Sequence, residues 1–168
     1  MSLEGKPAPD FTLEGSDGAS HSLKEYAGKT LVIYFYPRDN TPGCTSEAIG
    51  FRDLYPALKE LGAELVGVSK DSLKAHGKFV CDFGLPFTLL SDPDAAMMSA
   101  YGAFGEKVQY GKTTMGTIRS TVVVSPEGTI VKHWAKVPKA ADHPAKVLDF
   151  LTTLAGAPST SRKGPLRP

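Results

Sequence analysis

The chain has 168 residues, a length that suits one domain with a hydrophobic core of its own. Its hydrophobic content of 41% and charged content of 22% are ordinary for a globular protein. A formal net charge of +1 gives no electrostatic indication of a nucleic-acid or membrane partner, so we expect neither.

The N-terminal residues 1–7 contain no basic segment followed by an apolar one, which predicts a cytoplasmic location. Thiols stay reduced there, so the two cysteines are expected to be core residues, metal ligands or redox groups. Two cysteines alone do not complete a four-ligand zinc site. The four histidines, which show no paired metal spacing, are expected to be surface or locally hydrogen-bonded residues. We therefore expect neither a metal nor a bound cofactor.

The first 36 residues predict loops followed by one buried strand. Residues 1–30 are rich in Gly and Pro, with a short strand expected at residues 11–13 that pairs after a turn at residues 16–18. Residues 31–36 are all β-branched, aromatic or leucine. Such a run is typical of a strand buried on both faces, in a sheet covered by helices.

A helix is predicted from Pro42, because proline suits the first helical position and Thr41 suits the cap before it. Its apolar residues recur at helical spacing. Pro56 is expected to kink or restart this helix, and Gly62 to end it.

The remaining elements continue the alternation of strands and helices. They are expected as a strand at residues 63–69, a helix capped by Asp71 or Ser72 and running to residue 82, a strand at residues 87–90, a third helix at residues 92–101, a long glycine-rich loop at residues 102–117, a β-hairpin of residues 117–125 and 129–136, and a last helix at residues 140–154. This order predicts an α/β fold with a central mixed β-sheet flanked by helices. Residues 1–156 would form the domain, and residues 157–168 a disordered tail.

Cys44 lies two residues inside the start of the predicted helix, where backbone N–H groups stabilise an anion and so favour the thiolate. Its neighbours Gly43, Thr45 and Ser46 are small or polar, which is unlike a core environment. The hydroxyl of Thr41 would lie on the same face, within reach of the sulfur. These features favour a reactive thiol over a buried, inert one.

Residues 37–44, Pro-Arg-Asp-Asn-Thr-Pro-Gly-Cys, resemble the Pro-x-x-x-Thr-x-x-Cys motif of peroxiredoxins. The wider stretch of residues 34–53 is similar to the bacterioferritin-comigratory, or Q, subfamily. The likeness covers roughly residues 3–155 and continues through residues 66–71, 89–92, 119–121 and 126–128. The fixed Pro, Thr and Cys of this motif, placed directly after a buried strand, make it specific.

The resemblance implies a thioredoxin-like fold and a role for each motif residue. Cys44 would be the peroxidatic cysteine, Thr41 would hold the thiolate and the peroxide by hydrogen bonds, and Pro37 would shield the sulfur. Arg119 matches the family's active-site arginine, which favours the thiolate and polarises the O–O bond. The substrates would be hydrogen peroxide and small organic hydroperoxides, the reductant thioredoxin or a similar dithiol protein, and the chain a monomer.

The second cysteine departs from the commonest family pattern. Many members carry a resolving cysteine five residues after the first, where this chain has Ile49. Other members resolve from the following helix, and there Cys81 stands one position later than in those relatives. Helical geometry places Leu73, Gly77, Val80 and Phe83 on one face and Cys81 beside it, which favours an accessible thiol. Cys81 is thus the candidate resolving cysteine, and an incidental helix cysteine is the alternative.

Three other functions remain as alternatives. The first is a one-cysteine peroxidase that an external thiol resolves. The second is a thioredoxin-like disulfide oxidoreductase, which would need a Cys-x-x-Cys pair that this chain lacks. The third is a thioredoxin-fold binding module without turnover, and the intact set of Pro37, Thr41, Cys44 and Arg119 argues against it.

Overall fold

The computed structural model describes residues 3–109 and 111–156, and these residues form nine strands, four α-helices and one 3-10 helix. In chain order the elements are β1 (Thr12–Glu14), β2 (Ser20–Ser22), η1 (Leu23–Tyr26), β3 (Thr30–Phe35), α1 (Pro42–Glu60), β4 (Ala63–Ser69), α2 (Leu73–Phe83), β5 (Thr88–Ser91), α3 (Ala96–Ala100), β6 (Phe104–Gln109), β7 (Lys112–Thr117), β8 (Ser120–Val124), β9 (Ile130–Trp134) and α4 (His143–Gly156).

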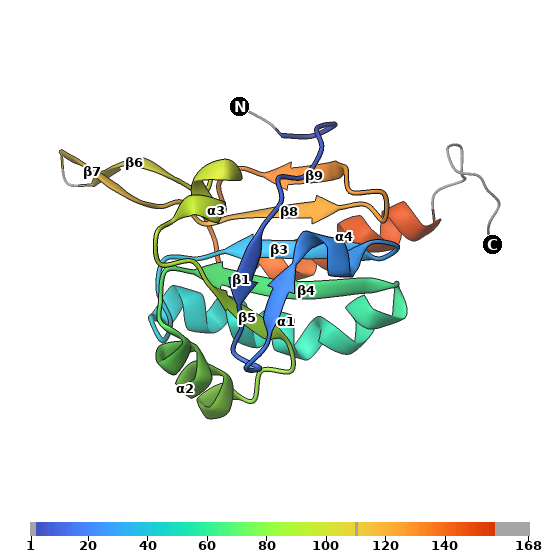
Figure 1. Ribbon diagram of the computed structural model, residues 1–168, viewed down its shortest axis with the longest axis horizontal. Coiled ribbons are helices and arrows are strands. Elements are labelled where there is room, and N and C mark those ends of the chain that lie inside the picture. The colour runs from blue at the N-terminus through green and yellow to red at the C-terminus, as the bar shows by residue number, and fades with distance from the viewer. Residues whose placement is uncertain (1–2, 110, 157–168) are drawn as a thin grey trace.

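A five-stranded mixed sheet with the order β5-β4-β3-β8-β9 forms the centre of the molecule (Figure 1). Strands β3, β4 and β5 run parallel, whereas β8 pairs antiparallel with both β3 and β9. Parallel neighbours need crossover connections, and α1 and α2 supply them. The predicted α/β class with a central mixed sheet flanked by helices is confirmed.

Strand β3 shows why the sheet carries a core on each face. Its alternate residues Leu31, Ile33 and Phe35 join one apolar cluster, and Val32 and Tyr34 join the other. The first cluster is completed by the N-terminal segment, η1 and α3, and the second by α1, α2 and α4. Helices α1 and α4 lie behind the sheet in Figure 1. The prediction of a strand buried on both faces is confirmed.

Helix α1 begins at Pro42 as predicted, with Thr41 in the extended conformation of an N-cap residue. The helix continues through Pro56 to Glu60 and does not restart. Proline lacks the N–H of one helical hydrogen bond, and the packing of α1 on the sheet outweighs that loss here. Gly62, with a φ of +80°, follows the helix end.

The start of α2 agrees with one of its two predicted caps, whereas the start of α3 differs from the prediction. In α2 the cap is Ser72, whose hydroxyl accepts a hydrogen bond from the backbone N–H of Ala75 at 3.2 Å, while Asp71 makes other bonds. Helix α3 begins only at Ala96, because the preceding residues form a turn in which Ala95 has a φ of +57°. The carboxylate of Asp92 accepts from the N–H of Met98 at 2.8 Å and so serves the first turn of this short helix.

The expectation of a long loop over residues 102–117 is wrong, because β6 and β7 form a hairpin there that projects from the body of the molecule (Figure 1). Gly105 and Gly116 lie opposite each other within its strands. Strand β7 is largely exposed, so it lacks the alternation of apolar and polar residues that identifies a half-buried strand.

The second predicted hairpin is confirmed as β8 and β9, and the last helix begins at His143. The proposed tail of residues 157–168 lies outside the described residues, so the domain boundary stays a prediction. Within the described part of the chain, no helix has the length and apolar character needed to cross a bilayer.

Candidate active site

Cys44 lies in the first turn of α1, directly after the loop that leaves β3. Its side chain is buried at the edge of the core between the sheet and α1, and its thiol is free. The first N–H groups of a helix have no partner within the helix, so their partial positive charge favours a negative charge on this sulfur.

Arg119 reaches Cys44 from the bend that separates β7 from β8. Its Nη2 donates to the Sγ of Cys44 at 3.3 Å, and its Nη1 donates to the Oε1 of Glu47 at 2.6 Å. Burial alone would lower the pKa of Arg119, but the charges of Glu47 and Cys44 raise it above its usual value. The guanidinium therefore stays positive beside the sulfur.

Gly43 makes the approach of Arg119 possible. A Cβ atom at this position would lie 3.1 Å from Nη2 of Arg119, closer than side chains normally pack. A larger residue before Cys44 would push the guanidinium away from the sulfur.

Glu47, one helical turn after Cys44, is fully buried, with 0% exposure. Its Oε1 accepts from Arg119, and its Oε2 has no hydrogen-bond partner among the described residues. Burial raises the pKa of Glu47 to about 7, although the neighbouring Arg119 opposes that change. The sequence analysis missed this residue, although its position three residues after Cys44 on the same helix was a usable signal.

Thr41 does not donate to the sulfur in this structure. Its hydroxyl donates to the backbone carbonyl of Arg38 at 3.0 Å and closes the loop before α1. Its predicted role toward the thiolate and the peroxide remains a prediction.

Pro37 and Arg119 share a cavity of about 630 Å³ beside the active-site loop. Pro37, Ile118 and Val137 contribute apolar walls, and charged residues complete the lining: Glu106, Lys107, Lys136 and Arg119. Such a mixed lining can accept a small amphipathic molecule next to the guanidinium that contacts Cys44.

Cys81 is exposed on α2, as predicted, and is not bonded to Cys44. The face of α2 that packs on the core is shifted from the expected one, although Val80 and Phe83 do pack there. The buried residues of this helix are His76 and Phe79, whereas Leu73 is 37% exposed. The structure thus places Cys44 and Arg119 in contact and leaves Cys81 exposed, without a bond to Cys44.

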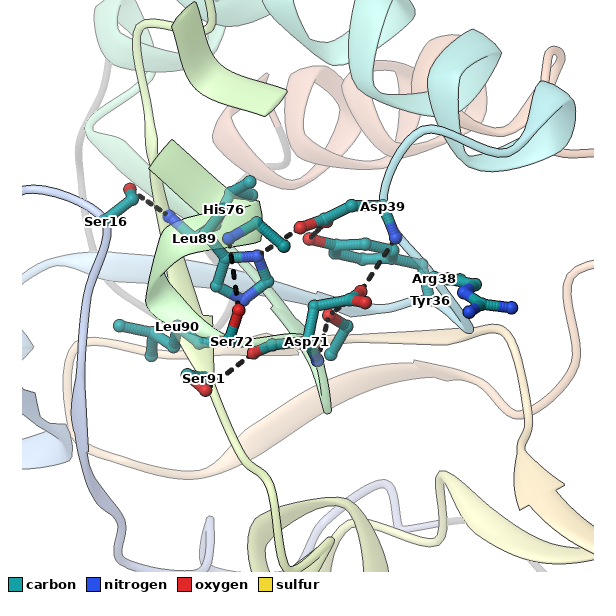
Figure 2. Close-up of polar contacts among 12 residues, drawn as sticks. Ser16, Tyr36, Arg38, Asp39, Asp71, Ser72, His76, Leu89, Leu90 and Ser91 are labelled. Carbon is teal, nitrogen blue, oxygen red and sulfur yellow. Dashed lines mark hydrogen bonds and ion pairs between the residues drawn. The ribbon is translucent and has the colours of Figure 1, made fainter. Parts of the chain in front are cut away.

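Two histidines, expected at the surface or in local hydrogen bonds, are instead buried. Each of them forms a hydrogen bond with a residue distant in the sequence. His143 bonds to the hydroxyl of Thr121 at 2.8 Å. His76 lies with Asp39 and Asp71, and one potential metal-ligating atom from each of the three lies within 4.8 Å of the others (Figure 2). No local sequence pattern indicates this cluster, because it depends on contacts between separate elements.

Known proteins match this chain over most of its length. The AhpC/TSA family matches residues 5–133. Peroxiredoxin Bcp of Bacillus subtilis is 44% identical over 156 residues, which is 92% of this chain and 99% of that protein. Peroxiredoxin Bcp of Xanthomonas campestris is 46% identical over 142 residues, which is 84% of this chain and 88% of that protein.

A solved structure of the Xanthomonas campestris bacterioferritin comigratory protein superposes with a TM-score of 0.82 at 44% identity, covering 86% of this chain and 92% of that one. It belongs to a set of trapped intermediate and ligand complexes that concern alkyl peroxide reduction. Two further structures of peroxiredoxin Q from the same organism each carry a serine in place of a cysteine.

Proposed function

Because this chain belongs to the AhpC/TSA family and is a thiol-dependent peroxidase of the peroxiredoxin type, we propose that the sulfur of Cys44 attacks the peroxide. The observation that carries this assignment is the 3.3 Å contact between Nη2 of Arg119 and Sγ of Cys44. A cation held against a buried sulfur at a helix N-terminus favours the nucleophilic thiolate.

The first step converts the Cys44 thiol and a hydroperoxide into a sulfenic acid and an alcohol, or water when the substrate is hydrogen peroxide. A sulfur–oxygen bond forms, the O–O bond breaks, and the leaving oxygen takes up a proton. Arg119 faces the atoms on which negative charge develops, so it stabilises the transition state electrostatically. At the same loop, Thr41 would hold the thiolate and the peroxide by hydrogen bonds, and Pro37 would shield the sulfur.

We propose hydrogen peroxide and small organic hydroperoxides as substrates. The apolar wall of Pro37, Ile118 and Val137 in the cavity beside Arg119 supports the organic class. The alkyl peroxide reduction studied in the Xanthomonas relative points the same way.

In the second step Cys81 would resolve the sulfenic acid. Its thiol condenses with the Cys44 sulfenic acid, releasing water and forming a disulfide, which thioredoxin or a similar dithiol protein then reduces by exchange. The exposure of Cys81 supports this role. We place the protein in the cytoplasm, because two free thiols suit a reducing compartment. The proposed enzyme is a monomer.

The test is mass spectrometry of the reduced protein after one equivalent of hydrogen peroxide, with non-reducing peptide mapping. We expect a loss of two hydrogens and a linked peptide joining Cys44 to Cys81. The matched variants Cys44→Ser and Cys81→Ser separate the steps: the first should lose peroxide consumption, and the second should stop at an oxidised Cys44.

Oxygen added to Cys44 while Cys81 stays free in the unmodified protein would mean that an external thiol resolves the enzyme. A Cys44 thiol that survives the peroxide would contradict the proposed role of this residue and favour the thioredoxin-fold binding module.

A further inference from the structure

A buried polar cluster joins the active-site loop to α2, the helix that carries Cys81 (Figure 2). The Oδ1 of Asp39 accepts from the hydroxyl of Tyr36 at 2.5 Å, and its Oδ2 lies 2.7 Å from Nδ1 of His76. The side chains of Asp39 and His76 are 5% and 0% exposed. Water screens such a pair very little, so the bond is far stronger than a surface ion pair.

The ring of His76 is held on both sides. Its Nε2 lies 2.9 Å from the carbonyl oxygen of Leu90, and a carbonyl can only accept, so Nε2 carries a hydrogen. A second hydrogen lies between Nδ1 and the carboxyl of Asp39. His76 thereby fixes the loop residue Asp39 to a strand of the central sheet.

The three residues are better explained as a hydrogen-bonded cluster than as a metal site. The Oδ2 of Asp71 already accepts from the backbone N–H of Asp39 at 2.7 Å and from the hydroxyl of Ser69 at 2.7 Å. The nearest atoms of Asp39 and His76 bond to each other. Each potential ligand atom thus has a partner of its own within the protein.

The cluster connects the two segments that carry the thiols. Asp39 stands five residues before Cys44, and His76 stands five residues before Cys81. A second connection lies at the other end of α2, where Nη1 of Arg52 on α1 donates to the carbonyl of Phe83 at 2.9 Å. Helix α2 is therefore held at both ends by α1 and its preceding loop.

A disulfide between the two cysteines has to bring a buried sulfur and an exposed one into contact. The sulfur of Cys44 is buried and contacts Arg119, whereas Cys81 is exposed on another helix. A disulfide needs Cα atoms within about 7 Å and both sulfurs in contact. The eleven-residue α2 is intrinsically weak, because it is short and contains Gly77, so tertiary contacts decide whether it stays folded.

We propose that Asp39 and His76 are positioning residues that form a clasp, which keeps the Cys44 loop and α2 folded during peroxide reduction and must open before Cys81 reaches Cys44. This inference rests on the proposed resolving role of Cys81. The clasp sets the lifetime of the Cys44 sulfenic acid. While it is closed, a second hydroperoxide can oxidise the sulfenic acid to a sulfinic acid and leave as an alcohol or water.

Two variants of His76 distinguish its hydrogen bond to Asp39 from its hydrogen bond to Leu90. The amide of His76→Asn falls near the position of Nδ1 and keeps a donor toward Asp39. The amide of His76→Gln falls near the position of Nε2 and keeps the bond to Leu90, but it abandons Asp39. Both variants lose the ring, so their difference reports the bond to Asp39 against the bond to Leu90.

The experiment is a rapid-quench single turnover of each reduced protein, in which thiol alkylation and peptide mapping follow Cys44 oxidation and disulfide formation separately. Loss of a charge-assisted bond predicts disulfide formation at least about tenfold faster in His76→Gln than in His76→Asn. With excess peroxide, His76→Gln should accumulate several-fold less sulfinic acid.

Equal rates of disulfide formation in the two variants would overturn the clasp while leaving the role of Cys81 intact, provided that the unmodified protein forms the disulfide. Absence of a Cys44–Cys81 disulfide in the unmodified protein would overturn the resolving role and the clasp together.

Should either His76 variant fail to fold, Asp39→Asn and Asp39→Ala provide the same comparison. The asparagine amide can accept from Tyr36 and donate to His76, so it keeps a neutral bond and its rate should stay well below that of the alanine variant. The alanine variant should be about tenfold faster, and equal rates would again overturn the clasp.

Discussion

At the scale of single residues, the charge beside Cys44 depends on a carboxyl that titrates near neutral pH. Glu47 is buried, holds Nη1 of Arg119 at 2.6 Å, and has a pKa raised to about 7, chiefly by burial. When Glu47 is ionised, its bond to Arg119 is charge-assisted and holds the guanidinium firmly. When Glu47 is protonated, that bond weakens and Arg119 is less well fixed on the sulfur.

We therefore expect Glu47→Gln to remove one component of the pH dependence of Cys44 oxidation. In the unmodified protein this component increases the rate as the pH rises through about 7, because Glu47 becomes ionised. The glutamine still accepts from Arg119 but does not titrate, so its rate should be several-fold lower at pH 8 and less dependent on pH. Stopped-flow rates of Cys44 oxidation between pH 5.5 and 8.5 measure this, and profiles of identical shape would contradict it.

At the scale of elements, α2 has one glycine inside it and one directly after it, and the two act on the helix in opposite ways. Gly77 lies inside the helix, and a Cβ atom added there would meet no other atom within 4 Å, so this glycine only weakens the helix. Gly84 follows the last turn with a φ of +60°, a left-handed conformation that suits glycine, and it ends the helix. Helix stability and helix ending thus depend on the same residue type for different reasons.

Replacing each glycine by alanine should change stability in opposite directions. Gly77→Ala should stabilise the protein by about 1 kcal/mol, through the higher helix propensity of alanine. Gly84→Ala should destabilise it by about 1 kcal/mol, because alanine is strained at positive φ. Denaturant unfolding measures both. Effects of the same sign would contradict these roles of the two glycines. The Gly77→Ala protein, with its more stable α2, should also form the Cys44–Cys81 disulfide more slowly.

The sequence predicted those elements whose start, end or burial depends on neighbouring residues in the chain. The apolar residues of β3, the proline at the start of α1 and the glycine that follows α1 each act through near neighbours. The β6–β7 hairpin was missed because Gly105 and Gly116, which indicate a loop locally, pair across its strands. At the site, motif residues such as Cys44 and Arg119 were predicted, but the buried role of His76 was not. It arises from a contact with Asp39, 37 residues away, that no local pattern encodes.

At the scale of the whole molecule, His143 joins α4 to both α1 and the central sheet. Its Nε2 bonds to Thr121 of β8, and its ring packs edge-on against Phe51 of α1 and Trp134 of β9. Burial first, and the charges of Lys146 and Arg119 next, lower the pKa of His143 to about 4. The folded protein therefore holds this ring neutral at a pH where the unfolded chain would protonate it.

This difference predicts a loss of stability in mild acid that depends on one residue. Because the folded pKa is about 4 and the unfolded value is 6.5, the unfolded chain binds more protons between these values. The free energy of unfolding should therefore fall as the pH drops below 6.5, and the His143 contribution between pH 7 and 5 is about 2 kcal/mol. His143→Gln can keep the bond to Thr121 but cannot titrate, so its stability should fall less over the same range. Urea unfolding of both proteins at pH 7, 6 and 5 isolates this contribution as the difference between the two curves. Parallel curves would show that the core does not hold His143 neutral, and a steeper fall in the variant would show that folding raises the pKa of this histidine instead of lowering it.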